Sequence, residues 1–176
     1  LTIPRSKYSA SFQLRKGQIL GVTGVSGVGK TSMLRALSLL DGRDAPITLH
    51  HQSPSTYNGG AITKWRQMVT WVSQHAPRQL SGSPMDFHQQ VLQFRRITPQ
   101  PAMDQFVSTA SQWGLDVSIL QRPWSTLSGG EAARASLASA VTLAGDVMLL
   151  DEPTVSCDRH TEQLIEETLQ KLSLRG

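Results

Sequence analysis

Residues 17–40 read GQILGVTGVSGVGKTSMLRALSLL, in which an apolar, a glycine-rich and an amphipathic segment follow one another. The apolar segment at 17–23 predicts a short buried strand, and the periodic apolar residues after Lys30 predict a helix. Between them, residues 24–31 match the pattern G-x-x-x-x-G-K-[ST], at the strand-to-helix position that phosphate binding requires. This stretch therefore predicts a strand, a phosphate loop and a helix in series, as in an α/β fold.

The predicted phosphate loop carries the groups that bind a triphosphate. Its glycines let successive backbone N–H groups curve around the phosphates. Lys30 supplies positive charge to the β and γ oxygens, which makes it a catalytic candidate, and the Thr31 hydroxyl can ligate Mg²⁺. The predicted nucleotide-binding residues are Gly24, Val25, Ser26, Gly27, Val28, Gly29, Lys30, Thr31 and Ser32.

Two further apolar segments end in polar residues. DVMLLDE at 146–152 predicts a central strand of a parallel sheet, and ligands of such sheets bind at the carboxyl ends of strands. Asp151 is therefore predicted to hold Mg²⁺, and Glu152 to act as the base that activates water. Gln74 ends a second predicted strand, MVTWVSQ at 68–74, and is predicted to reach the same metal or the attacking water.

Helical patterning dominates the middle and the end of the chain. Residues 84–122, interrupted by TPQP, predict a small helical lobe, whereas 41–63 predict loop or short strand. TLSGGEAARASLASAV at 126–141 places two glycines at a helix start, where they are costly. They indicate either a phosphate at the helix N-terminus or a plain loop-to-helix junction. Another amphipathic helix is predicted around residues 164–172.

The composition restricts the class of protein. The 176 residues suit one domain, and we expect a helical subdomain at 84–140 within it. The net charge is +4, but the basic residues are scattered and do not indicate nucleic acid. No apolar run approaches the roughly 18 residues of a membrane span. The histidines and the single cysteine, Cys157, lack zinc-ligand spacing.

Together these segments resemble an ATP-binding cassette (ABC) ATPase over nearly the whole chain. GVSGVGKT resembles the Walker A motif of that family, Gln74 its Q-loop and LSGGE its signature motif. VMLLDEPT resembles its Walker B motif, and SCD at 156–158 its D-loop. The resemblance implies an α/β P-loop NTPase with a mostly parallel central sheet and a small helical subdomain carrying LSGG. It also implies ATPase activity with ATP and Mg²⁺.

The resemblance also implies partners. In this family two cassettes pack head to tail, and the LSGG of one closes over the γ-phosphate bound by the other. Ser128, Gly129, Gly130 and Asp158 are therefore implied to contact nucleotide. The expected partners are a second cassette, identical or paired, and a transmembrane permease that holds the chain at the cytoplasmic face of a membrane. The sequence at 116–131 is similar to cassettes paired with metal exporters.

Some features depart from the family pattern. Ala133 and Ser139 stand where Gln and Arg are usual, and Tyr8 lies very close to the phosphate loop for the aromatic residue that stacks on adenine. The switch histidine, expected roughly 30 residues after the Walker B acids, would fall beyond Gly176. We therefore expect the parent protein to continue with another apolar strand, and residues 1–176 alone to aggregate or unfold because buried backbone groups lack partners.

Two alternative functions stay open at this stage. One is a non-transport ABC ATPase, such as a chromosome or repair ATPase head, although residues 32–126 lack the sustained heptads of its coiled coils. The other is a nucleotide-binding module with impaired hydrolysis, which the absent histidine favours and the intact Lys30, Asp151 and Glu152 oppose.

Overall fold

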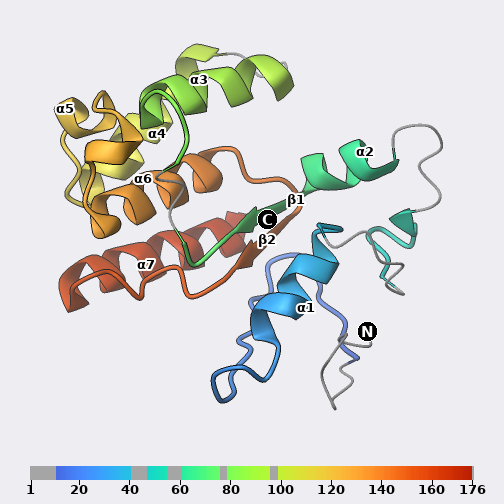
Figure 1. Ribbon diagram of the computed structural model, residues 1–176. Coiled ribbons are helices and arrows are strands. Elements are labelled where there is room, and N and C mark those ends of the chain that lie inside the picture. The colour runs from blue at the N-terminus through green and yellow to red at the C-terminus, as the bar shows by residue number, and fades with distance from the viewer. Residues whose placement is uncertain (1–10, 41–46, 55–60, 76–78, 96–98, 176) are drawn as a thin grey trace. The chain divides into compact units, whose positions relative to one another are not determined.

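The computed structural model describes residues 11–40, 47–54, 61–75, 79–95 and 99–175 (Figure 1). The chain divides into two compact units. The first consists of Leu1–Trp71, Gly145–Asp151 and Leu172–Gly176. The second consists of Val72–Ala144 and Glu152–Lys171.

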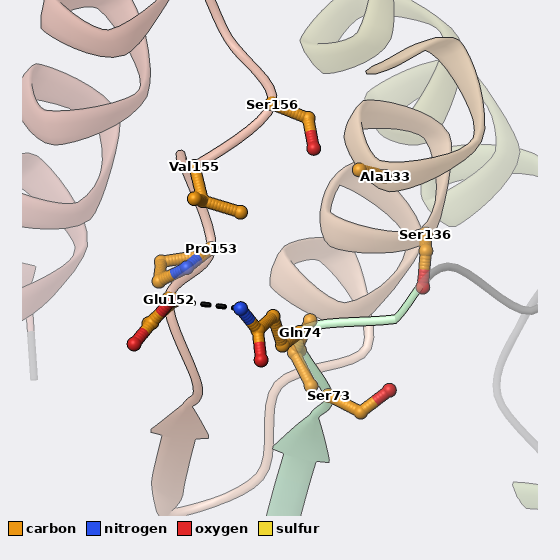
Figure 2. Close-up of a pocket in the computed structure, with 9 residues that line it drawn as sticks. Ser73, Gln74, Ala133, Ser136, Glu152, Pro153, Val155 and Ser156 are labelled. Carbon is orange, nitrogen blue, oxygen red and sulfur yellow. Dashed lines mark hydrogen bonds between the residues drawn. The ribbon is translucent and has the colours of Figure 1, made fainter. Parts of the chain in front are cut away.

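The first unit contains the sheet and two short helices. These are α1 (Lys30–Leu37), α2 (Ala61–Met68), β1 (Val69–Val72), whose last residue belongs to the second unit, and β2 (Val147–Leu150). β1 pairs with β2, and their arrows point the same way in Figure 2. The strands predicted at 68–74 and 146–152 and the helix after the phosphate loop are thus confirmed.

The core of the first unit explains why α2 forms. Trp65 is 3% exposed and packs with Leu39, Val69 and Leu149. Its indole N–H donates to the Leu37 carbonyl oxygen at 2.8 Å. An isolated eight-residue helix is marginal in water, so packing of this tryptophan stabilises it. The sequence prediction of loop or short strand at 41–63 was wrong where α2 begins, because so short a helix leaves little periodicity.

The strand predicted at 17–23 was also wrong. These residues form neither helix nor strand, and Ile19, Leu20 and Val22 are 65%, 46% and 44% exposed. A strand requires a neighbour to bond its backbone groups. The two described strands pair with each other, so apolar content alone does not make this segment a strand.

The second unit is built from helices. Its elements are α3 (Pro84–Arg95), α4 (Pro99–Gln112), α5 (Val117–Leu120), the 3₁₀ helix η2 (Trp124–Thr126), α6 (Gly129–Thr142) and most of α7 (Arg159–Arg175). α4 packs against α3 and α6, with Phe106, Leu120, Trp124 and Leu137 among the fully buried side chains. The predicted helices are confirmed, whereas the 84–140 subdomain boundaries stay a prediction.

A buried polar pair lies within this helical unit. His88 is 0% exposed, stacks on Phe106 at 4.3 Å between ring centroids, and hydrogen-bonds through Nδ1 to the Ser139 hydroxyl at 2.9 Å. Burial lowers the pKa of His88 to about 4, because the charged imidazolium loses its hydration. Ser139, a departure from the family pattern, thus has a hydrogen-bonding role inside the core.

Candidate nucleotide-binding site

The phosphate loop is an open turn in front of α1. Gly27 and Gly29 have φ of 79° and 107°, values that side-chain-bearing residues rarely adopt. No side chain caps the start of α1 within the described part of the chain, where Gly29 is the N-cap. The first-turn N–H groups of this helix therefore lack a capping side chain, as an anion site requires.

Lys30 folds back over this loop. Its ammonium group donates to the carbonyl oxygens of Gly24 at 2.9 Å and Val25 at 3.4 Å. Thr31 is exposed in the first turn of α1, and Asp151, directly after β2, is 4% exposed. The first unit thus contains the predicted loop, its lysine and one of the two acids.

Glu152 and Gln74 meet in the second unit. The Gln74 amide nitrogen donates to Glu152 Oε2 at 2.8 Å (Figure 2). Both side chains line a small pocket together with Ala133, Val155 and Ser156. Sequence reasoning placed Gln74 near the water that Glu152 activates, and the structure places the two side chains in direct contact.

The backbone at Glu152 is unusual. Its φ is 49°, in the left-handed region that few residues other than glycine occupy. Such conformations cost on the order of 1–3 kcal/mol and cluster at functional sites. Glu152 is exposed, so its carboxylate is accessible to water.

Ser128 and Glu131 form a capping box at the start of α6. The Ser128 hydroxyl accepts from the Glu131 backbone N–H at 3.2 Å, and Glu131 Oε2 accepts from the Ser128 N–H at 2.7 Å. This bond from the Ser128 backbone holds the pKa of the Glu131 carboxyl below its usual range. Sequence reasoning missed this role, although serine followed three residues later by glutamate is its signature.

The two glycines of LSGGE differ in their surroundings. A Cβ at Gly130 would lie 3.0 Å from the Ser156 carbonyl oxygen, whereas one at Gly129 would meet no described heavy atom within 4 Å. A side chain at 130 would therefore push the Ser156 backbone away by a few tenths of an ångström, so packing inside the chain favours glycine there. At Gly129 the described residues supply no such preference, which leaves its bare backbone open to an external group.

Asp158 caps α7. Its carboxylate accepts from the Thr161 backbone N–H at 2.9 Å and from the Thr161 hydroxyl at 2.8 Å. These hydrogen bonds, the backbone one first, lower the pKa of the Asp158 carboxyl. A contact of Asp158 with nucleotide stays a prediction.

The structure brings only some of the predicted residues together. Gln74 contacts Glu152, Gly130 lies against the segment that follows Glu152, and Lys30 contacts the phosphate loop. Tyr8 lies outside the described residues. Those that are described contain no cluster of three or more His, Cys, Asp or Glu side chains arranged to bind a metal.

Comparison with known proteins assigns the family. The family model described as "ABC transporter" matches residues 8–155. The chain belongs to the ABC transporter family. It is 28% identical over 173 residues to a phosphonates import ATP-binding protein of Halalkalibacterium halodurans, covering 91% of this chain and 65% of the relative. It is 27% identical to the phosphate import ATP-binding protein of Thermotoga maritima, covering 94% of this chain and 69% of the relative.

Solved structures show the same fold. The dimeric post-hydrolysis state of the ATP-binding cassette MJ0796, bound to ADP and Pi, superposes with a TM-score of 0.76 at 21% identity. The match covers 93% of this chain and 73% of that chain. This ABC chain therefore has the α/β fold of P-loop ATP-binding cassettes, with strands and a helical region.

The match covers only part of each of the first curated relatives. The chain spans 60% to 65% of the length of the first four curated relatives it matches. Among the helices of the described residues, none combines the length and apolar character that crossing a bilayer requires.

Proposed function

We propose that this ABC chain binds ATP at residues 24–32 and hydrolyses it to drive a separate transmembrane transport subunit. The observation that carries the proposal is the phosphate loop itself. Its lysine ammonium lies against the loop carbonyls, and α1 begins at Lys30 without a side-chain cap among the described residues. A triphosphate supplies the negative charge that both features attract.

The proposed metal ligands are hard oxygen donors. Thr31 offers an exposed hydroxyl, Asp151 a carboxylate at the end of β2, and Gln74 an amide oxygen at the end of the segment that follows β1. This donor set suits Mg²⁺, which prefers oxygen ligands. When bound, Mg²⁺ would neutralise phosphate charge and leave the chain's own residues to orient the nucleotide.

Glu152 is the proposed general base. Gln74 donates to Oε2, which leaves Oε1 of the exposed carboxylate to accept a proton from water. General base catalysis contributes roughly 10²–10⁴ in rate. The Gln74 amide restricts the orientation of the Glu152 carboxylate through this hydrogen bond, so Gln74 supports proton abstraction from water.

The proposed partners follow from the open backbone at Gly129 and from the family. A second cassette would place its bound γ-phosphate against Ser128 and Gly129, and a permease would hold the pair at the cytoplasmic face of a membrane. Two relatives are named as importers of phosphonates and of phosphate. Their names support ATP-driven transport and lend no support to metal export, so the proposal leaves the cargo open.

Nucleotide binding tests the proposal directly. A fluorescent ATP analogue with Mg²⁺ should bind the wild-type protein and lose affinity with Lys30→Met. Lys64→Met, which removes an exposed lysine on α2, is the matched control and should bind normally. Equal affinity in all three proteins would contradict the assignment of the loop. Binding without turnover would favour a nucleotide-binding module instead of an ATPase.

A further inference from the structure

The segment that follows Glu152 approaches α6 very closely at one position. We call residues 153–158 the post-Glu152 turn. Its Ser156 carbonyl oxygen lies 3.0 Å from the position that a Cβ of Gly130 would take. Neighbouring α6 positions Ala133 and Ser136 are small and line a pocket with Pro153 and Val155 (Figure 2). The turn therefore contacts α6 closely at Gly130, whereas a small pocket adjoins it at Ala133 and Ser136.

Arg134 lies one helical turn beyond Gly130 and reaches the same place. Its Nη1 lies 3.3 Å from the Gly130 Cβ position. Its positive charge acts on the Cys157 thiol, next to Ser156, and lowers the pKa of that thiol against the effect of burial. Its Nε is buried without a hydrogen-bond partner in the described structure, so burying Arg134 here carries a desolvation cost.

The post-Glu152 turn is short and internally bonded. The Val155 N–H donates to the Glu152 carbonyl oxygen at 3.3 Å, and the Cys157 N–H donates to the Thr154 carbonyl oxygen at 2.9 Å. Because the turn is bonded to the Glu152 carbonyl, we expect a shift at Ser156 to reach the Glu152 backbone, whose left-handed φ of 49° depends on its surroundings.

We propose that Gly130 and Arg134 together form a seat for the post-Glu152 turn, and that Arg134 is thereby a positioning residue for Glu152. Gly130 permits the backbone approach, and the Arg134 guanidinium, which lies beside the same Gly130 position, attracts the turn through its positive charge. The inference that the seat serves hydrolysis rests on the proposed function. The seat itself is a property of the second unit and needs no nucleotide.

Cys157 is the only cysteine and provides a direct probe of the seat. It is half-buried, and burial, opposed in part by Arg134, raises the pKa of its thiol. Displacing the turn should expose the thiol and increase its rate of alkylation by iodoacetamide. The test is to measure this rate in the full chain without nucleotide, with circular dichroism to confirm folding.

Gly130→Ala and Gly129→Ala form a matched pair. Both residues lie in the first turn of α6, where alanine favours the helix over glycine. Only the new Cβ at 130 meets the Ser156 carbonyl. Gly130→Ala should raise the alkylation rate about 5-fold to 30-fold by favouring the open turn, whereas Gly129→Ala should leave it unchanged. Equal rates in the two variants would overturn the seat.

Arg134→Met tests the guanidinium at similar side-chain length. Because Arg134, Asp158 and Glu162 all act on the thiol pKa, the rate is measured against pH and compared at its high-pH plateau. The plateau should rise about 5-fold to 30-fold, and Arg134→Lys should restore part of the wild-type value. An unchanged plateau in Arg134→Met would overturn the role of Arg134.

Steady-state ATPase assays test the link to hydrolysis. Arg134→Met should lower kcat about 10-fold with KM for ATP unchanged, because misplacing Glu152 affects the transition state and not nucleotide binding. An unchanged kcat would overturn the positioning role. If the wild-type protein hydrolyses no ATP, the proposed function fails, while the alkylation comparison still decides whether the seat exists.

Discussion

Helices α1 and α6 both begin next to glycines, but their first-turn N–H groups differ in whether a side chain caps them. α1 begins after glycines with positive φ and without a capping side chain among the residues described, whereas α6 begins with the Ser128–Glu131 capping box. A capping side chain occupies some of the first-turn N–H groups of a helix and so reduces the number that an anion can bind. The contrast shows that glycines at a helix start do not define one kind of site.

The glycine before α1 and the glycine in the first turn of α6 also have different roles. Gly27 meets no described heavy atom at its Cβ position and is favoured by its φ of 79°, whereas Gly130 is favoured by the close approach of the Ser156 carbonyl oxygen. One glycine shapes a loop for a ligand, and the other lets two backbone segments pack.

The largest expected effect lies outside both helix starts. Glu152→Gln should retain ATP binding at the phosphate loop and slow hydrolysis by roughly 10²–10⁴, because the amide cannot accept the proton from water. ATP-dependent dimers should accumulate and be visible by sedimentation. Gln163, exposed on α7, provides a control position, since Gln163→Glu should leave turnover unchanged. Unchanged turnover in Glu152→Gln would remove Glu152 from the base role.

The next effect distinguishes the two helix starts directly. Gly129→Asp should leave nucleotide binding to the monomer nearly intact and abolish ATP-dependent dimerisation. A carboxylate there would face the γ-phosphate of the partner cassette, and like charges at such an interface cost several kcal/mol. Binding is followed by fluorescence and dimerisation by sedimentation. Loss of monomer binding would instead assign LSGG to the chain's own nucleotide site.

A smaller effect concerns the far end of α6, where Ser139 meets His88. The folded-state pKa of His88 is lowered from 6.5 to about 4, so the unfolded chain binds the proton more tightly. The stability contributed by neutral His88 is complete above about pH 6.5 and is lost as pH falls toward 4. At 1.36 kcal/mol per pKa unit, the full loss is about 3 kcal/mol.

Thermal melts across this range measure the effect. His88→Gln retains a group able to hydrogen-bond Ser139 but does not titrate, so its melting temperature should vary less with pH between 6.5 and 4. His160, exposed near the start of α7, is the control, and His160→Gln should keep the wild-type pH dependence. Identical pH profiles for wild type and His88→Gln would contradict this account.

The smallest effect tests the capping difference itself. Ser128→Ala removes the side-chain acceptor at the start of α6 and should destabilise the protein by about 1 kcal/mol, the usual cost of a lost N-cap. Ser26→Ala in the phosphate loop removes an exposed hydroxyl and should change stability by less than about 0.5 kcal/mol. Denaturant unfolding compares the two, and equal losses would contradict the contrast between the helix starts.

Local patterns predicted much of the fold. The phosphate-loop pattern located the turn and α1, and the apolar runs located β1 and β2 within one or two residues at each end. Periodicity located the helical lobe and α7. The candidate site residues were also read from short motifs, because each motif concentrates its chemistry within a few neighbouring residues. Their roles in nucleotide binding and hydrolysis stay predictions.

Long-range contacts account for what local patterns missed. α2 forms around Trp65, which packs against residues from α1, β1 and β2, and the apolar segment at 17–23 forms no strand. Periodicity describes how a segment divides its polar and apolar faces, but it does not supply the neighbour that a strand or a short helix requires.

The sequence alone specified the chemical groups available to this protein: a glycine-rich loop ending in Lys30 and Thr31, and an apolar run ending in Asp151 and Glu152. Only the tertiary structure decided that Gln74 donates to Glu152 across 78 residues and that Gly130 lies against Ser156. Local motifs depend on backbone geometry within a few residues. Contacts between distant segments depend instead on packing of the whole unit, which no short window of sequence contains.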